Sequence, residues 1–149
     1  MALDDIYKET ILDHYKHPRN KRELPEAERS CTRNNPLCGD EITVLVHLEG
    51  DRIGDVAFQG AGCSISTASA SMMTEALKGK TRGEAQALFA RFREVVTGHG
   101  SEQDLAELGE MAAMAGVSRF PTRVKCATLG WHSALAALGE GERKVSTEE

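Results

Sequence analysis

Apolar residues along this chain recur at helical spacing near its start, then alternate with polar residues, and then return to helical spacing. The first helical pattern covers residues 3 to about 16. Pro18 follows it, which predicts an amphipathic helix that ends before the proline. Residues 21–35 are charged and polar, so this stretch is predicted to be irregular, with room for one short edge strand over 28–33.

The alternation over residues 42–48 predicts a strand with one strongly apolar face. Residues 49–52 have turn chemistry and residues 53–59 resemble a second strand, so together they predict a β-hairpin. In a regular strand Val56 and Phe58 would lie on one face and Ile53 on the other. A β-bulge near Gly54 would reconcile the two.

The rest of the chain is predicted to be mostly helical. Apolar stripes at helical spacing predict helices over residues 64–77, 82–96, 101–115 and 121–138, and glycine, proline and capping residues separate them. The order of helix, hairpin and several helices predicts an α+β fold with a small antiparallel β-sheet of about three strands. We expect one domain over residues 1–139 and a disordered charged tail over 140–149.

Composition and charge exclude several classes of function. The chain has 23 acidic and 18 basic residues and a net charge of −5, without the concentrated basic patch that nucleic-acid binding uses. Its start is acidic and lacks the apolar stretch of a signal peptide, and no apolar run is long enough to span a membrane. We therefore expect a cytoplasmic protein with no nucleic-acid or membrane partner. Since thiols stay reduced there, its four cysteines indicate metal binding or thiol chemistry rather than disulfides.

Three of the cysteines have neighbours that favour a thiolate. Cys38 follows a turn-rich loop, and the glycine after it lets the backbone fold so that Cys38 and Asp40 can face one point. Cys63 comes directly before a predicted helix, where unpaired amides and the helix dipole favour negative charge. Cys126 lies in the first turns of the last predicted helix, near two basic residues.

Three thiolates and one carboxylate form a four-coordinate set that suits Zn²⁺, or iron in a cluster with sulfide. Closed structural zinc sites use cysteine and histidine, so Asp40 indicates a site that can open. Cys31 has no comparable context and is interpreted as a semi-exposed residue of an edge strand. His14 and His17 could share a helix face, but solvated or capping roles are favoured over metal binding.

Four motifs connect this chain to a known family. They are Asp13-His14-Tyr15 with Pro18-Arg19-Asn20, Asn35-Pro36-Leu37-Cys38-Gly39-Asp40, Phe58-Gln59-Gly60-Ala61-Gly62-Cys63-Ser64-Ile65-Ser66, and Arg123-Val124-Lys125-Cys126-Ala127-Thr128-Leu129-Gly130-Trp131. Together they resemble the U-type iron–sulfur cluster assembly proteins (IscU, SufU and the N-terminal part of NifU), up to about Leu138. The resemblance implies a SufE/NifU-like fold.

Two features resemble the SufU subgroup more than IscU. Lys125 stands where IscU-like chains carry a histidine, and the segment around 99–118 looks like the insertion found in SufU-type chains. The resemblance therefore implies a zinc-containing sulfur acceptor that works with a pyridoxal-phosphate-dependent cysteine desulfurase (SufS-like) and a downstream cluster-assembly complex. Such a protein is a zinc-dependent sulfurtransferase that acts with its desulfurase rather than as a stand-alone enzyme.

Carried over to this chain, the resemblance implies Zn²⁺ bound by Cys38, Asp40, Cys63 and Cys126. It assigns Cys38 as the thiol that accepts persulfide sulfur. Arg123 stands beside the site and is a candidate assisting cation, with an ordinary surface arginine as the alternative. One alternative is a scaffold that assembles a [2Fe–2S] cluster on the same cysteines. Another is a binding module with a purely structural zinc. A hydrolase with a Cys–His pair ranks last, because no histidine stands at a persuasive position.

Overall fold

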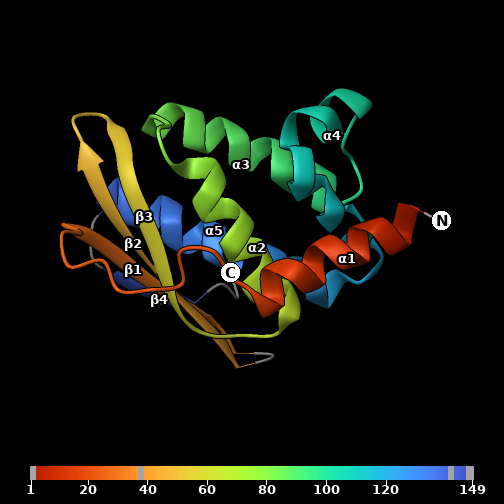
Figure 1. The fold of residues 1–149 in the computed structure, drawn as a ribbon, viewed down its shortest axis with the longest axis horizontal. Coiled ribbons are helices and arrows are strands. Elements are labelled where there is room, and N and C mark those ends of the chain that lie inside the picture. The colour runs from red at the N-terminus through yellow and green to blue at the C-terminus, as the bar shows by residue number, and fades with distance from the viewer. Residues whose placement is uncertain (1–2, 37–38, 141–142, 147–149) are drawn as a thin grey trace.

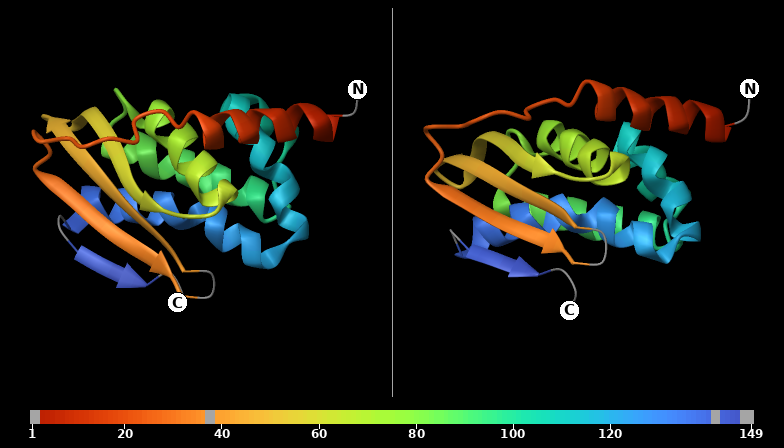
Figure 2. Two further views of the ribbon diagram at one scale, coloured as in Figure 1. Left: turned by 60° about the horizontal axis from the view of Figure 1, so that its bottom comes forward. Right: turned by 90° about the horizontal axis from the view of Figure 1, so that it is seen from below.

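The computed structural model describes the backbone of residues 3–36, 39–140 and 143–146, and the side chains of residues 9–36 and 39–139. A small sheet forms one layer and the helices pack beside it (Figures 1 and 2). This confirms the predicted α+β class. The elements are α1 Leu3–Lys16, β1 Arg29–Asn35, β2 Asp40–Glu49, β3 Arg52–Ala61, α2 Ser64–Leu77, α3 Arg82–Val96, α4 Glu102–Leu108, the 3₁₀ helix η1 Gly109–Arg119, α5 Pro121–Glu140 and β4 Arg143–Ser146.

The sheet has the strand order β3-β2-β1-β4. β1, β2 and β3 form the predicted antiparallel part, while β4 pairs with β1 in parallel. β4 lies within the segment 140–149, which the sequence predicts to be a disordered tail. Its four residues instead pair with the outer edge of β1 and extend the sheet by one strand. The pairing of β2 with β3 shifts between His47 and Leu48 and leaves Gly54 without a partner, which confirms the predicted β-bulge.

One face of the sheet is covered by helices. α5 packs on β1 and β2, and α2 packs on β3. Ile42, Val44 and Val46 alternate along β2 and are fully buried beneath these helices. Cys31 pairs with Val44 in the sheet and shares its buried face, with 2% of its surface exposed. Cys31 is therefore a core residue and not the semi-exposed residue predicted from the sequence.

The predicted helix over residues 101–115 is divided in two. Ser101 begins α4 with a capping box, as its spacing to Asp104 predicts. α4 then ends at Leu108, because Gly109 has a φ of 60°, and the chain continues as the 3₁₀ helix η1. No helix in the described part of the chain is long and apolar enough to cross a membrane.

Antiparallel pairing brings the start of β2 beside the end of β3, with Glu41 opposite Ala61. α2 begins directly after β3, so its first turn lies at this same end of the sheet. Gly60 makes the close approach possible. Its φ is 121°, and a Cβ there would lie 2.1 Å from the carbonyl oxygen of Glu41.

We expect Gly60→Ala to lower the free energy of unfolding by about 1–3 kcal/mol, because the new methyl group meets backbone in a conformation that favours glycine. Urea unfolding followed by circular dichroism measures the change. Gly83→Ala is the matched control, since a Cβ there would meet Thr81 Oγ1 only at 4.0 Å, an ordinary contact, and Gly83 lies in α3 without a left-handed φ. An equal effect of the two substitutions would contradict the strain at Gly60.

Candidate metal centre

Asp40, Cys63 and Cys126 come together at the end of the sheet where α2 and α5 begin. One carboxylate oxygen of Asp40 and the two sulfur atoms all lie within 4.8 Å of one another. Asp40 and Cys126 are buried, with 5% and 3% of their surfaces exposed, and Cys63 is half-buried. Three residues that are far apart in the sequence thus converge on one point, as their contexts predict.

Asp40 is the first residue of β2, and both of its carboxylate oxygens accept hydrogen bonds from the start of α2. The backbone N–H of Cys63 donates to Oδ1 at 3.1 Å, and the hydroxyl of Ser66 donates to Oδ2 at 2.5 Å. These bonds offset the cost of burying the carboxylate. They also hold its oxygens beside the cysteine sulfurs.

Cys63 occupies the N-cap position of α2, with an extended backbone (φ −68°, ψ 174°), and its side chain makes no capping hydrogen bond. The sulfur instead lies 3.6 Å from Ser66 Oγ. Ser66 therefore contacts both Asp40 and Cys63. Since Ser66 stands one helical turn after the N-cap, its hydroxyl points back toward the residues that precede the helix.

Cys126 comes from the second turn of α5, which packs against α2. Its sulfur lies 3.7 Å from the carbonyl oxygen of Thr122. Ser69 of α2 donates a hydrogen bond to the carbonyl oxygen of Ala127 at 2.6 Å. This bond holds α5 against α2 at Ala127, the residue that follows Cys126. The distance between Cys63 and Cys126 therefore depends on the contact between α2 and α5.

Cys38 lies outside the described residues, so its place at the centre stays a prediction. Gly39, which follows it, has a φ of 77°, the left-handed conformation that the sequence analysis expects of a folded-back loop. The fourth cysteine, Cys31, is in the core and takes no part in the cluster of Asp40, Cys63 and Cys126.

The donor set fits a thiophilic divalent metal ion. Metal–sulfur bonds of about 2.3 Å place the ligand atoms of a tetrahedral zinc site roughly 3.5–4 Å apart, so small shifts would close this cluster around an ion. Two thiolates and a carboxylate favour Zn²⁺, or iron with sulfide, over Mg²⁺ or Ca²⁺. A fourth ligand position is left for another donor.

An apolar groove of about 560 Å³ lies next to this centre. Its walls come from α1, the first turn of α2, η1 and the start of α5. Among its lining residues, Leu12 and Phe120 expose 38% and 59% of their surfaces. Arg123, the predicted assisting cation, is exposed on the first turn of α5 and lines the same groove.

The structure gives two residues a different place from the one that the sequence indicated. Ser66 holds Asp40 and approaches Cys63, and its position three residues after a cysteine N-cap was the available signal. His14 was expected to be solvated or to cap a helix, but it is 1% exposed and hydrogen-bonded on both ring nitrogens. Its place on the helix face that carries Ile11 was the available signal.

The fold and the centre define a small α+β protein with an aspartate and cysteines arranged for metal binding. The NifU-like N terminal domain family matches residues 6–127. The zinc-dependent sulfurtransferase SufU of Bacillus subtilis (strain 168) is 47% identical over 140 residues, covering 94% of each protein. The chain therefore belongs to the family of NifU-like N-terminal domains.

Two further proteins are similar over most of their length. The iron–sulfur cluster assembly scaffold protein IscU of Streptococcus pyogenes serotype M1 is 44% identical over 136 residues, which cover 91% of this chain and 84% of that protein. A crystal structure of a putative iron–sulfur cluster assembly scaffold protein for the SUF system, from Fervidobacterium islandicum AW-1, has a TM-score of 0.81. It is 34% identical and covers 92% of this chain and 99% of its own. The predicted family and fold are confirmed.

We expect Ser66→Ala to weaken the binding of a divalent metal ion at this centre by about 10–100-fold, because Ser66 orients the Asp40 carboxylate. Competition with a chromophoric chelator measures the affinity. Asp40→Ala removes the carboxylate itself and is expected to have the larger effect. Ser118→Ala, on η1, is the control with the same loss of a hydroxyl. If the Ser66→Ala and Ser118→Ala variants bind the metal ion with equal affinity, Ser66 does not support the centre.

Proposed function

We propose that this protein is a zinc-dependent sulfurtransferase of iron–sulfur cluster assembly. It accepts persulfide sulfur from a pyridoxal-phosphate-dependent cysteine desulfurase in the cytoplasm and passes it to a downstream cluster-building complex. The observation that carries the proposal is the convergence of Asp40, Cys63 and Cys126 within 4.8 Å. The similarity to the B. subtilis sulfurtransferase supports it.

In this proposal Asp40, Cys63 and Cys126 would hold the zinc ion, and Cys38 would be its fourth ligand. When bound, zinc supplies a Lewis-acidic centre that keeps thiols deprotonated and shielded until a partner needs them. Ser66 and the backbone N–H of Cys63 position Asp40. A carboxylate is a harder ligand than a thiolate and exchanges more readily at a thiophilic ion, which suits a centre that opens during transfer.

Cys38 is the proposed sulfur acceptor. Its thiolate attacks the outer sulfur of the persulfide on the desulfurase, a new sulfur–sulfur bond forms on Cys38, and the bond on the desulfurase breaks. The desulfurase cysteine leaves as a thiolate, so no oxidant or reductant is consumed. Arg123, exposed at the groove, would attract the negatively charged persulfide or its carrier.

We expect Cys38→Ser to abolish the transfer of ³⁵S from a cysteine desulfurase that is supplied with labelled cysteine. Covalent label retained on the chain under non-reducing conditions is the readout. Cys31→Ala is the matched control and should accept sulfur normally, since Cys31 lies in the core away from the centre. If Cys38→Ser accepts sulfur as well as the unsubstituted protein, the proposed transfer fails and a purely structural metal becomes the better interpretation.

A second candidate function is a scaffold on which a [2Fe–2S] cluster is assembled from the same cysteines. The 44% identity with the S. pyogenes scaffold protein favours this alternative. Against it, Lys125 stands beside Cys126, and ammonium side chains do not bind iron as imidazole does. Sulfur transfer is therefore the first proposal.

Metal content separates the two functions. We expect protein purified without oxygen to contain zinc in about a 1:1 ratio to the chain, because three thiolates, with Cys38 included, and the Asp40 carboxylate would make a four-ligand set that suits zinc. Elemental analysis and acid-labile sulfide measure the content. Iron with an equal amount of sulfide, and little zinc, would favour the scaffold over the carrier.

A further inference from the structure

A second cluster of candidate metal ligands lies away from the thiol centre. A ring nitrogen of His14 and a carboxylate oxygen each from Glu75 and Glu110 all lie within 4.8 Å of one another. His14 comes from α1, Glu75 from the last part of α2, and Glu110 from η1. The cluster shares no residue with Asp40, Cys63 and Cys126.

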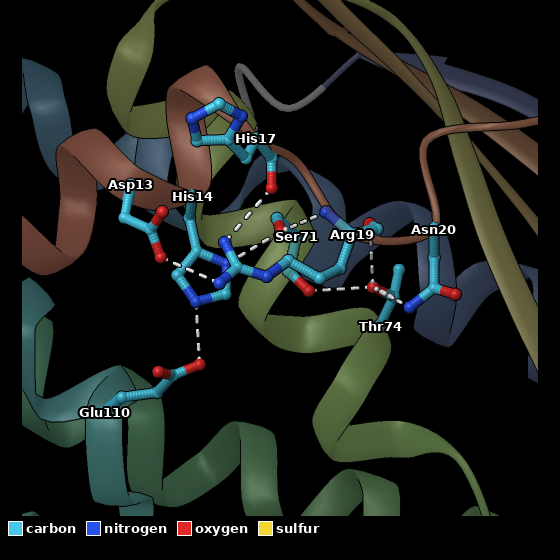
Figure 3. A network of polar contacts seen from close by, with 8 residues as sticks. All are labelled: Asp13, His14, His17, Arg19, Asn20, Ser71, Thr74 and Glu110. Atoms are coloured by element: carbon cyan, nitrogen blue, oxygen red, sulfur yellow. Dashed lines mark hydrogen bonds and ion pairs between the residues drawn. The ribbon is translucent and has the colours of Figure 1, made fainter.

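His14 is the buried member of this cluster, with 1% of its surface exposed. Its Nδ1 lies 2.7 Å from Ser71 Oγ, and its Nε2 lies 2.7 Å from Glu110 Oε1 (Figure 3). Ser71 also accepts the backbone N–H of Arg19 at 2.8 Å, so this hydroxyl is held from two sides. A histidine fixed through Nδ1 by such a hydrogen bond presents Nε2 as a metal ligand in a defined direction.

The two glutamates are exposed, so an ion can reach the cluster from solvent while the imidazole below it is fixed. The nearby cation, Arg19, is held by other groups. Its guanidinium donates to Asp13 Oδ2 at 2.7 Å and to the carbonyl oxygen of His17 at 3.0 Å. Figure 3 shows the Arg19 side chain with its contact to Asp13. Arg19 also interacts electrostatically with Glu75 and Glu110, but its printed hydrogen bonds go to Asp13 and His17, so the two carboxylates remain able to bind a cation.

We propose that His14 Nε2, Glu75 and Glu110 bind a divalent first-row transition-metal ion, such as Fe²⁺, Co²⁺ or Zn²⁺. One imidazole and two carboxylates suit these ions better than they suit copper(I), which prefers sulfur, or Ca²⁺, which prefers oxygen ligands alone. Water molecules would fill the remaining positions on the solvent side. This site stands independently of the proposed sulfur transfer.

An ion at this site would connect α1 and η1 through α2. These same elements supply walls of the apolar groove beside the thiol centre, with Ile11 and Leu12 on α1 and Val117 on η1. His14 lies three residues after Ile11, so a bond from its ring to Glu110 fixes the spacing between the two walls. Metal binding here would therefore stabilise the groove as well as the fold.

A cobalt titration tests the proposal. Zinc-loaded protein is titrated with Co²⁺ under nitrogen, and uptake is followed by elemental analysis after gel filtration and by the visible absorption of bound Co²⁺. We expect about one Co²⁺ per chain beyond the zinc, without the intense sulfur-to-cobalt charge-transfer band that a thiolate ligand produces. The melting temperature of the zinc-loaded protein should rise with Co²⁺ concentration.

Glu75→Gln and Glu110→Gln remove one carboxylate each and should lower the Co²⁺ affinity by more than about tenfold and cancel the rise in melting temperature. Glutamine at position 110 can still accept the hydrogen bond from His14 Nε2. If Glu110 only served to stabilise the fold through this bond, Glu110→Gln would therefore have little effect. Glu94→Gln on α3 is the control with the same loss of charge. The proposal is wrong if no extra Co²⁺ binds, if both glutamine variants bind it as tightly as the control, or if uptake brings a charge-transfer band.

Discussion

The buried hydroxyl groups of α2 hold the functional end of this molecule together. Ser66, Ser69, Ser71 and Thr74 are each at most 2% exposed, and each one is hydrogen-bonded. A buried hydroxyl without a partner would cost about 1–3 kcal/mol, so each side chain requires its neighbour in one position. Ser66 fixes the start of β2, Ser69 fixes α5, and Ser71 and Thr74 fix α1 and the segment that follows it. The position of the thiol centre is a consequence of these bonds.

Asp40 has two tasks that oppose each other. Both of its oxygens accept hydrogen bonds from the start of α2, which compensates for its burial. Each oxygen retains further lone pairs, so it can bind a metal ion while those hydrogen bonds persist. If a metal ion were bound and then released, the carboxylate would keep these partners throughout. A centre that opens and closes therefore needs little rearrangement of the backbone.

Much of the fold and the centre could be predicted from local signals in the sequence. Apolar alternation identified the β2–β3 hairpin, the parity of Ile53 identified its bulge, and cysteine contexts identified Asp40, Cys63 and Cys126 as one cluster. Long-range pairing was harder. The parallel addition of β4 to β1 has no local pattern, because charged residues at a sheet edge resemble a solvated tail. Similarly, the burial of Cys31 depends on its register opposite Val44, and the short sequence around it carries no such information.

The same distinction explains His14. A histidine near the end of an amphipathic helix looks solvated when only that helix is considered. Its burial arises because η1, almost a hundred residues later, covers α1 and brings Glu110 to 2.7 Å from its ring. The segment that supplies Glu110 also supplies a wall of the groove beside Cys63. α2 follows Cys63 at its start and carries Ser71, which contacts His14, in its middle, so one helix connects the thiol centre with the contact between His14 and η1. The contact of His14 with Glu110 joins α1 and η1, which border the same groove as the start of α2 beside Cys63.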